Sequence, residues 1–252
     1  DISLPETQRK LLEELLKTGK PVVVVLLAGR PLEMEWTAKN ASAIINTWFG
    51  GTEAGNATAD VLFGDVNPSG KLSMTFPRNV GQVPIYYSYK NTGRPLPEDA
   101  WFQKFKSNYL DVPNEPLYPF GYGLSYTSFS YGQPSVSEDS LNGDQELVLK
   151  IPVTNTGKIA GKEVVQLYIR DVVGSATRPL KELKGFQKIE IPAGETQTVS
   201  FQITPEDLKY YRYDLSGKSQ DILYDWEPGQ FELMVGTNSS DVQSIKVHWT
   251  NE

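Results

Sequence analysis

The first 64 residues alternate between helix-like and strand-like spacing of apolar positions. Leucines at 11, 12, 15 and 16, separated by charged residues, predict an amphipathic helix over 5–17. The β-branched run over 21–28 predicts a strand covered on both faces by helices. A polar stretch over 33–40 predicts a second helix, an apolar stretch over 43–49 predicts a second strand, and a third helix follows to about residue 62. This order of elements indicates an α/β layer.

Residues 66–126 form a long connector that is punctuated by prolines and glycines. Connectors of this length are uncommon unless they are functional or packed on their neighbours. Seven aromatic residues lie between Tyr86 and Tyr109, and this composition favours packing over disorder. We therefore expect the connector to dock against the neighbouring elements.

Short alternating segments recur from about residue 128 onward, with turn residues between them. They lie at 146–154, 163–170, 180–191, 197–204, 229–236 and 242–249. Six or seven strands in about 125 residues are typical of a β-sandwich. The sequence thus predicts an α/β part followed by an all-β part. We place the first at 1–76, the aromatic connector at 77–126 and the β-sandwich at 127–252.

Composition excludes several classes of function. A formal net charge of −7 argues against a nucleic-acid binder or a polybasic membrane binder. The absence of cysteine excludes a disulfide framework and a thiolate metal site. The longest apolar run, 22–28, is far shorter than the roughly 20 residues that span a bilayer. The single histidine, His248, is expected to face solvent in the last strand, and we expect no metal and no cofactor.

The best-marked motif is GGTEAGNATADVLFGDVNPSGKL, at 50–72. Its two glycines let the backbone approach closely after the second strand, and Thr52 is expected to cap the third helix, with Glu53 near the positive end of that helix. Further motifs follow the same order along nearly the whole chain: GKPV at 19–22, GRPL at 29–32, GQVPIYY at 81–87, NTGRP at 91–95, LYPFGYGLSYTSF at 117–129, EVVQLY at 163–168, LKGF at 183–186 and EPG at 227–229.

Together these motifs resemble the C-terminal part of family 3 glycoside hydrolases. The resemblance implies part of a six-stranded α/β sandwich domain, followed by a fibronectin type III-like (immunoglobulin-like) β-sandwich. It also implies a retaining mechanism, in which one carboxylate attacks the anomeric carbon and another protonates the leaving oxygen. In this family the nucleophile is an Asp on an N-terminal (β/α)8 barrel, and the acid/base is a Glu shortly before a stretch resembling residues 1–5. We therefore expect the chain to begin in mid-protein and to contain no catalytic residue.

The chain's own carboxylates offer an alternative source of a catalytic pair. The candidates near glycines and aromatic residues are Glu53, Asp60, Asp65, Asp111 and Glu115. Most acidic residues of a protein are solvated surface charges, so their presence alone is weak evidence for catalysis. Asp60 and Asp65 are better explained as residues that organise the turn before Asn67.

Four residues are expected to contact substrate: Trp48, Glu53, Trp101 and Tyr109. Aromatic faces stack on sugar rings, and Trp48 follows a strand at the edge where α/β sheets bind ligands. Each also has a purely structural explanation. Glu53 would then only support the turn and helix, and the aromatic residues around Trp101 and Tyr109 would attach the connector to the rest of the chain. The structural explanation is favoured for Glu53 and for these connector aromatics.

Two hypotheses of function follow. In the first, the parent protein is an exo-acting β-glucosidase that hydrolyses terminal β-linked glucose from oligosaccharides or glycosides, and this chain completes its cleft. The resemblance then implies a periplasmic or secreted location. In the second, the chain is a non-catalytic carbohydrate-binding or scaffold module. The first is favoured because the motifs run through the α/β layer as well as the sandwich. An incomplete α/β layer exposes apolar surface, which favours pairing with the N-terminal barrel portion or with a second copy of the chain as a homodimer.

Overall fold

The computed structural model describes residues 1–97, 100–214 and 221–251. The chain divides into two compact units, and each is built from separate stretches of sequence. The first unit contains Asp1–Asn67, Leu72–Tyr86 and Arg94–Phe120. The second contains Pro68–Lys71, Tyr87–Gly93 and Gly121–Glu252. The predicted connector is therefore divided between the two units.

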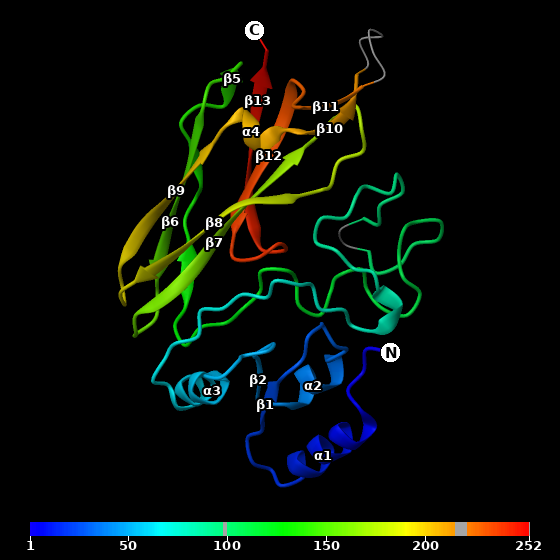
Figure 1. Ribbon diagram of the computed structural model, residues 1–252, viewed down its shortest axis with the longest axis vertical. Coiled ribbons are helices and arrows are strands. Elements are labelled where there is room, and N and C mark those ends of the chain that lie inside the picture. The colour runs from blue at the N-terminus through cyan, green and yellow to red at the C-terminus, as the bar shows by residue number, and fades with distance from the viewer. Residues whose placement is uncertain (98–99, 215–220, 252) are drawn as a thin grey trace. The chain divides into compact units, whose positions relative to one another are not determined.

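The first unit begins with alternating helices and strands, as the sequence predicts (Figure 1). The elements are α1 (Glu6–Leu16), β1 (Val23–Leu26), α2 (Glu35–Asn40), β2 (Ala43–Asn46) and α3 (Ala54–Phe63). Strands β1 and β2 pair in parallel, with Val23 opposite Ala43 and Leu26 opposite Asn46. The carboxyl ends of both strands therefore lie at the same edge of this sheet. The only other helix of this unit in the described residues is the single turn η1 (Val80–Gln82).

The prediction that β1 is covered on both faces is wrong. Only Leu26 of this strand is buried, and Val23 is 42% exposed. Helix α3 buries none of its residues, and Phe63 at its end is largely exposed. The small core of the unit forms around Leu26, Met34 and Phe76. The expected exposure of apolar surface on this layer is confirmed.

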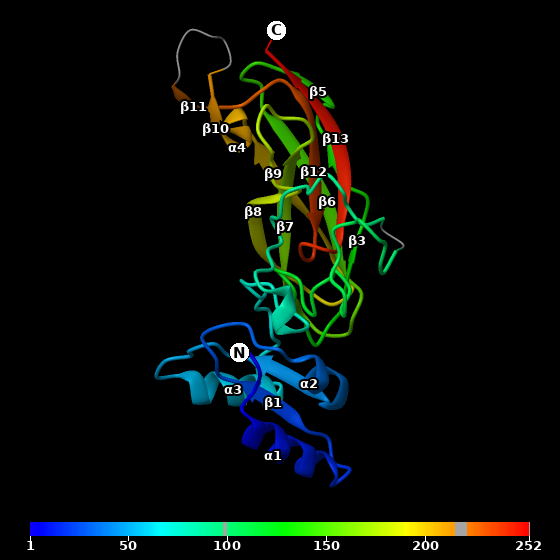
Figure 2. The ribbon, with the colours of Figure 1, turned by 90° about the vertical axis from the view of Figure 1, so that its right-hand side faces the viewer.

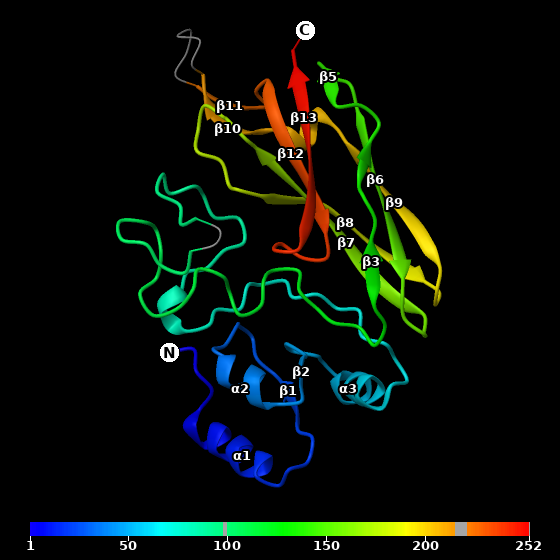
Figure 3. The same cartoon turned by 180° about the vertical axis from the view of Figure 1, so that it is seen from behind.

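The second unit is a sandwich of two β-sheets (Figures 2 and 3). One sheet has the order β5 (Ser140–Asn142), β13 (Val242–Thr250), β12 (Gly229–Gly236), β7 (Gly161–Asp171) and β8 (Glu182–Ile191). The other contains β3 (Phe129–Tyr131), β6 (Leu147–Asn155), β4 (Ser135–Val136) and β9 (Thr196–Ile203). A separate hairpin pairs β10 (Tyr210–Tyr213) with β11 (Ile222–Asp225), after the short helix α4 (Pro205–Leu208).

All six strands expected in the sandwich are present, and their pattern of burial explains why they form. Along β6, every second side chain points into the core, so that Leu147, Leu149, Ile151 and Val153 are fully buried. Burial of each such side chain stabilises the fold by roughly 1.5–3 kcal/mol. The expectation of six or seven strands was too low, because β3, β4, β5, β10 and β11 are too short to show a clear alternation.

Residues 68–71 of the connector dock on the sandwich through a buried ion pair. Lys71 Nζ lies 3.1 Å from Glu163 Oε2, and the two side chains are only 13% and 4% exposed. The Lys71 ammonium also donates to the carbonyl of Gly123 at 3.0 Å, and the Tyr131 hydroxyl donates to Glu163 Oε1 at 3.0 Å. The approach is close, because a Cβ on Gly123 would lie 2.3 Å from the Gly70 carbonyl oxygen. Both buried charges are therefore paired and hydrogen-bonded.

A second stretch of the connector, 87–93, covers the outer face of β7 and β8. The ring of Tyr87 packs edge-on against Tyr168, with centroids 5.8 Å apart, and the Leu183 N–H donates to the Tyr87 hydroxyl at 3.3 Å. Gln166 lies beside Tyr168 and donates to the carbonyls of Gly121 and Thr237 at 3.1 and 2.6 Å. The predicted docking of the connector is confirmed for this stretch.

Asn155 connects two loops at one end of the sandwich. Its side chain is fully buried and makes four hydrogen bonds. Oδ1 accepts from the Thr127 hydroxyl at 2.6 Å and from the Gly157 N–H at 3.0 Å. Nδ2 donates to the carbonyls of Ile159 and Ile191, each at 2.8 Å. The full donor and acceptor capacity of the amide is therefore used.

Replacing Asn155 with alanine should lower the free energy of unfolding of the sandwich by about 2–5 kcal/mol, because four buried partners lose their hydrogen bonds at once. Urea denaturation followed by near-ultraviolet circular dichroism measures this change. Asn142→Ala is the matched control, since Asn142 is exposed, and it should change stability by less than about 0.5 kcal/mol. Equal effects of the two substitutions would contradict the role assigned to Asn155.

Candidate functional site

The common edge at the carboxyl ends of β1 and β2 is where an α/β sheet binds ligands. Trp48 lies just after β2 in a left-handed backbone conformation, with φ of +49°, which is uncommon for a residue other than glycine. Its ring packs against Phe76, with centroids 6.0 Å apart, and Phe76 packs against Tyr118 at 6.2 Å. Trp48 is partly buried, so only part of its ring is available to a ligand.

Asn46, the last residue of β2, is a site residue that the sequence reasoning missed. Both polar atoms of its amide are buried and have no hydrogen-bond partner among the described residues. Buried polar groups in native structures are nearly always hydrogen-bonded, because a buried group without a partner lowers the stability of the fold by about 1–3 kcal/mol. The signal in the sequence was that Asn46, a polar residue, ends the otherwise apolar strand β2. The amide therefore has unused hydrogen-bonding capacity in the described part of the chain.

A loop over 94–115, here called the aromatic loop, carries two of the predicted substrate contacts. The loop closes at its base, where the Ser107 N–H donates to the Arg94 carbonyl at 2.9 Å. Trp101 is 56% exposed and packs against Phe102, with ring centroids 6.2 Å apart. Tyr109 is partly buried, and its hydroxyl donates to the backbone carbonyl of Gln82 at 3.1 Å. The loop thus presents Trp101 to solvent and uses Tyr109 partly as an anchor.

Gln82 holds the aromatic loop in place, although no pattern in the sequence singled it out. Its side chain is fully buried. Oε1 accepts from the Arg78 N–H at 2.6 Å, and Nε2 donates to the Pro113 carbonyl at 2.8 Å and to the Glu115 carbonyl at 3.3 Å. These bonds join η1 to the C-terminal half of the loop.

Arg78 extends this network to α2. Its Nε donates to the Glu115 carbonyl at 3.0 Å, and Nη1 pairs with the Glu35 carboxylate at 3.2 Å. Glu35 also pairs with Lys39, at 3.0 Å. The hydrogen bond and charge of Lys39, assisted by Arg78, lower the pKa of the Glu35 carboxyl against the opposing effect of burial. The aromatic loop is therefore connected to the α/β layer through one partly buried cluster of charges.

Glu53 lies at the start of α3. Figures 1 and 3 show that α3 and the aromatic loop lie on opposite sides of this unit. Its exposed carboxylate accepts a hydrogen bond from Asn56 Nδ2 at 2.6 Å. The expectation that Thr52 caps this helix is wrong, because the N-cap is Glu53 and no side chain makes a capping hydrogen bond. The four predicted contacts therefore belong to three places: Trp101 and Tyr109 on one loop, Trp48 at the sheet edge, and Glu53 at α3.

The five carboxylates weighed as catalytic candidates are all exposed: Glu53, Asp60, Asp65, Asp111 and Glu115. None of the five therefore has the buried surroundings that are common for a catalytic carboxyl group. Asp111 accepts a hydrogen bond from Asn79 at 3.2 Å, which helps to hold the aromatic loop. His248 is exposed on β13, as expected.

Comparison with known protein families identifies both parts of the chain. Residues 1–126, half of the chain, match the glycosyl hydrolase family 3 C-terminal domain. The chain belongs to glycoside hydrolase family 3. Residues 163–239 match the fibronectin type III-like domain, so the predicted order of an α/β part and a fibronectin type III-like sandwich is confirmed.

Several members of family 3 are similar to this chain over nearly its whole length. The periplasmic β-glucosidase of Salmonella typhimurium is 50% identical over 244 residues, which cover 96% of this chain and 31% of the relative. A β-xylosidase of Formosa agariphila is 45% identical and covers 98% of this chain and 32% of the relative. The crystal structure of a β-glucosidase from Listeria innocua in complex with glucose superposes with a TM-score of 0.91 at 44% identity, covering 99% of this chain and 34% of that one.

The chain thus spans about a third of the length of these family 3 relatives. In the described ranges, no three acidic or histidine side chains are grouped so that they could hold a metal ion. Among the helices of residues 1–97, 100–214 and 221–251, none combines the length and apolar composition needed to cross a lipid bilayer.

The lowered pKa of Glu35 gives a pH-dependent prediction for this family 3 domain. A carboxyl whose folded-state pKa is depressed stabilises the fold above its unfolded pKa of about 4.3, and this contribution is lost as the pH falls through the folded pKa. Glu35→Gln should therefore lower local stability by about 0.5–1 kcal/mol at pH 7 and have no effect well below pH 4.

Protection of the Arg78 N–H against hydrogen exchange, which reports on the network, measures this difference at both pH values. Glu33→Gln is the control, because no ion pair of Glu33 is present in the described residues, and it should leave the protection unchanged. A loss of protection that is equal at pH 7 and at low pH would contradict the ionic contribution of Glu35.

Proposed function

We propose that this chain is the C-terminal third of a retaining, exo-acting β-glucosidase, which removes terminal β-linked glucose from oligosaccharides or glycosides. The observation that carries the proposal is the match over 99% of the chain, with a TM-score of 0.91, to a β-glucosidase of Listeria innocua whose structure contains glucose. The similarity covers the α/β unit as well as the sandwich, which is expected of an enzyme part and not of a separate binding module.

In this proposal the two catalytic carboxylates are supplied by the N-terminal portion of the enzyme. A retaining glycosidase requires a nucleophile and an acid/base about 5–5.5 Å apart. The candidate carboxylates in the described residues, Glu53, Asp60, Asp65, Asp111 and Glu115, are all exposed, which does not favour either role. The chain alone is therefore inactive, and its role is to complete the cleft and to stabilise the enzyme.

The cleft-completing residues are proposed to be Trp48, Glu53, Trp101 and Tyr109. Trp101 has the strongest support, because its exposed ring is held on a loop whose base is anchored by the buried Gln82. Asn46 is added to this set, since its buried amide lacks partners. Fixed aromatic rings and amides suit a sugar, whose C–H faces are apolar and whose hydroxyls both donate and accept hydrogen bonds.

We further propose the division of the chain into a partial α/β domain at 1–76, a connector at 77–126 and the sandwich at 127–252. The exposed apolar residues of the α/β layer, including Leu11, Phe49 and Phe63, support pairing with the N-terminal barrel portion or with a second copy of the chain. The name of the Salmonella typhimurium relative supports a periplasmic or secreted location.

The proposal predicts that the chain alone does not hydrolyse an aryl β-glucoside. Activity should appear when a separately produced N-terminal portion is added. This portion contains the barrel and continues through the acid/base Glu that is expected shortly before residue 1. Initial rates measured with each part alone and with both parts test this directly. An aryl β-xyloside in parallel assays distinguishes a glucosidase from a xylosidase. Turnover proportional to the concentration of this chain alone would place a catalytic pair within it and refute the assignment.

In the reconstituted enzyme, Trp101→Ala should raise KM about tenfold while kcat falls less, because a stacking contact of roughly 1.4 kcal/mol is lost from substrate binding. Phe186→Ala is the matched control, since Phe186 is a similarly exposed aromatic residue on β8, and it should leave KM unchanged. If Trp101→Ala lowers thermal stability but leaves KM unchanged, Trp101 only packs the loop.

A further inference from the structure

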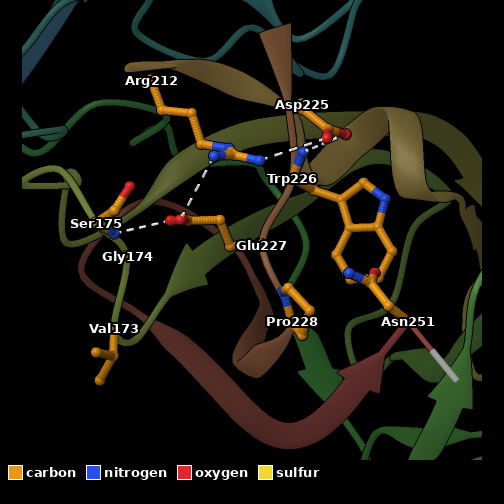
Figure 4. A pocket seen from close by; sticks show the side chains of 9 residues that line it. All are labelled: Val173, Gly174, Ser175, Arg212, Asp225, Trp226, Glu227, Pro228 and Asn251. Atoms are coloured by element: carbon orange, nitrogen blue, oxygen red, sulfur yellow. Dashed lines mark hydrogen bonds and ion pairs between the residues drawn. The ribbon is translucent and has the colours of Figure 1, made fainter. Parts of the chain in front are cut away.

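The sandwich unit contains a pocket that the proposed hydrolase function does not use. Its volume is about 450 Å³, which lies within the range of roughly 300–1,000 Å³ typical of small-molecule sites. It is lined by the loop after β7, by one residue each of β10 and β11, by the turn before β12 and by Asn251 after β13 (Figure 4). Its polar lining consists of Ser175, Arg212, Asp225, Glu227 and Asn251.

Arg212 keeps unused hydrogen-bonding capacity in this pocket. Its side chain is only 17% exposed, yet Nε is buried and has no hydrogen-bond partner in the described part of the chain. Its ion pairs with Asp225 and Glu227 are 3.5 and 3.9 Å long. Charge-assisted hydrogen bonds are about 2.7–2.9 Å long, so neither contact satisfies the guanidinium. The group is held in place by charge, and its two terminal nitrogens border the pocket with only these long contacts.

Glu227 is positioned as a rigid acceptor opposite Arg212. One carboxylate oxygen accepts hydrogen bonds from the Ser175 N–H at 2.7 Å and from the Tyr210 hydroxyl. Tyr210 is itself held by Arg178, whose guanidinium lies 4.0 Å from the centre of its ring. Burial alone would raise the pKa of Glu227, but these hydrogen bonds and the charge of Arg212 lower it, so the group is an anion at neutral pH.

Trp226 supplies an aromatic wall. Its ring packs on the core residue Trp249, with centroids 6.3 Å apart at 62°, and it is only partly buried. Figure 4 shows its indole beside Asn251 on one side of the pocket, with Ser175 and Val173 on the other. The wall is therefore fixed by the core of the sandwich and does not depend on a mobile side chain.

These features select one class of ligand. Two carboxylates against one guanidinium leave the pocket with a net negative charge, which disfavours phosphates and carboxylates. Separate donors and acceptors around a fixed aromatic ring match the hydroxyls and the apolar face of a sugar. We propose that this pocket binds a neutral pyranose unit and that the sandwich unit is thus a carbohydrate-binding module. The proposal does not depend on the proposed hydrolase function, because binding requires no turnover.

Spectra correlating ¹H and ¹⁵N in the isotope-labelled chain test the proposal. D-glucose, D-xylose and cellobiose would be titrated to about 100 mM, since small polar ligands in open sites bind in the millimolar range. Saturable shifts are expected for the Ser175 N–H and the Trp226 indole. Arg212→Met should weaken binding at least about tenfold, because hydrogen bonds from a charged group are lost.

Two further variants keep the test decisive if Arg212→Met loosens the hairpin. Asn251→Ala changes an exposed residue and should weaken binding about threefold. Tyr224→Ala is the control, because Tyr224 lies on the outward face of β11 and is 53% exposed, and it should leave binding unchanged. Three results overturn the proposal: no saturable shift at these signals, binding that neither Arg212→Met nor Asn251→Ala affects, or inorganic phosphate binding more tightly than glucose at the same signals.

Discussion

The buried ion pair between Lys71 and Glu163 is the contact on which the path of the chain depends. It fixes residues 68–71 on the sandwich, although the elements before and after this stretch belong to the α/β unit. A buried charge is tolerated only where it is paired and hydrogen-bonded, and here Gly123 and Tyr131 complete the pairing. The chain therefore passes repeatedly between the two units before the sandwich begins. No single cut through the connector would therefore separate the residues of one unit from those of the other.

The strands of the sandwich could be predicted because their burial alternates, and the exceptions show where sequence reasoning ends. Along β7, Glu163 and Val165 face the core as the period of two requires. Gln166 and Tyr168 point the other way and are buried as well, because Tyr87 and the backbone at Gly121 cover that face. This covering comes from residues far away in sequence. No local pattern around β7 contains it, so the burial of both faces could not be predicted from the sequence of the strand alone.

The candidate site shows the same limit. Aromatic composition identified the loop that carries Trp101, but it could not show which residues hold the loop. That role belongs to Gln82, whose side chain is fully buried and whose hydrogen bonds go to backbone carbonyls about 30 residues away in the chain. Asn46 was missed for a related reason: an asparagine at the end of a strand is ordinary, and only burial without partners makes it informative.

The hairpin β10–β11 carries charged as well as apolar side chains on its inner face, and this bears on what the sandwich does. Tyr211 and Tyr224 face solvent with their rings tilted against each other, 4.8 Å apart between centroids, whereas Arg212 lies on the opposite face with the buried Tyr210 and pairs with the half-exposed Asp225. A hairpin shaped by stability alone would not place a guanidinium on the same face as the buried Tyr210, because burying a guanidinium without full hydrogen bonding is costly. The inward charges are instead arranged around a cavity. Such an arrangement is expected where binding, and not core packing, determined which residues occupy the inner face.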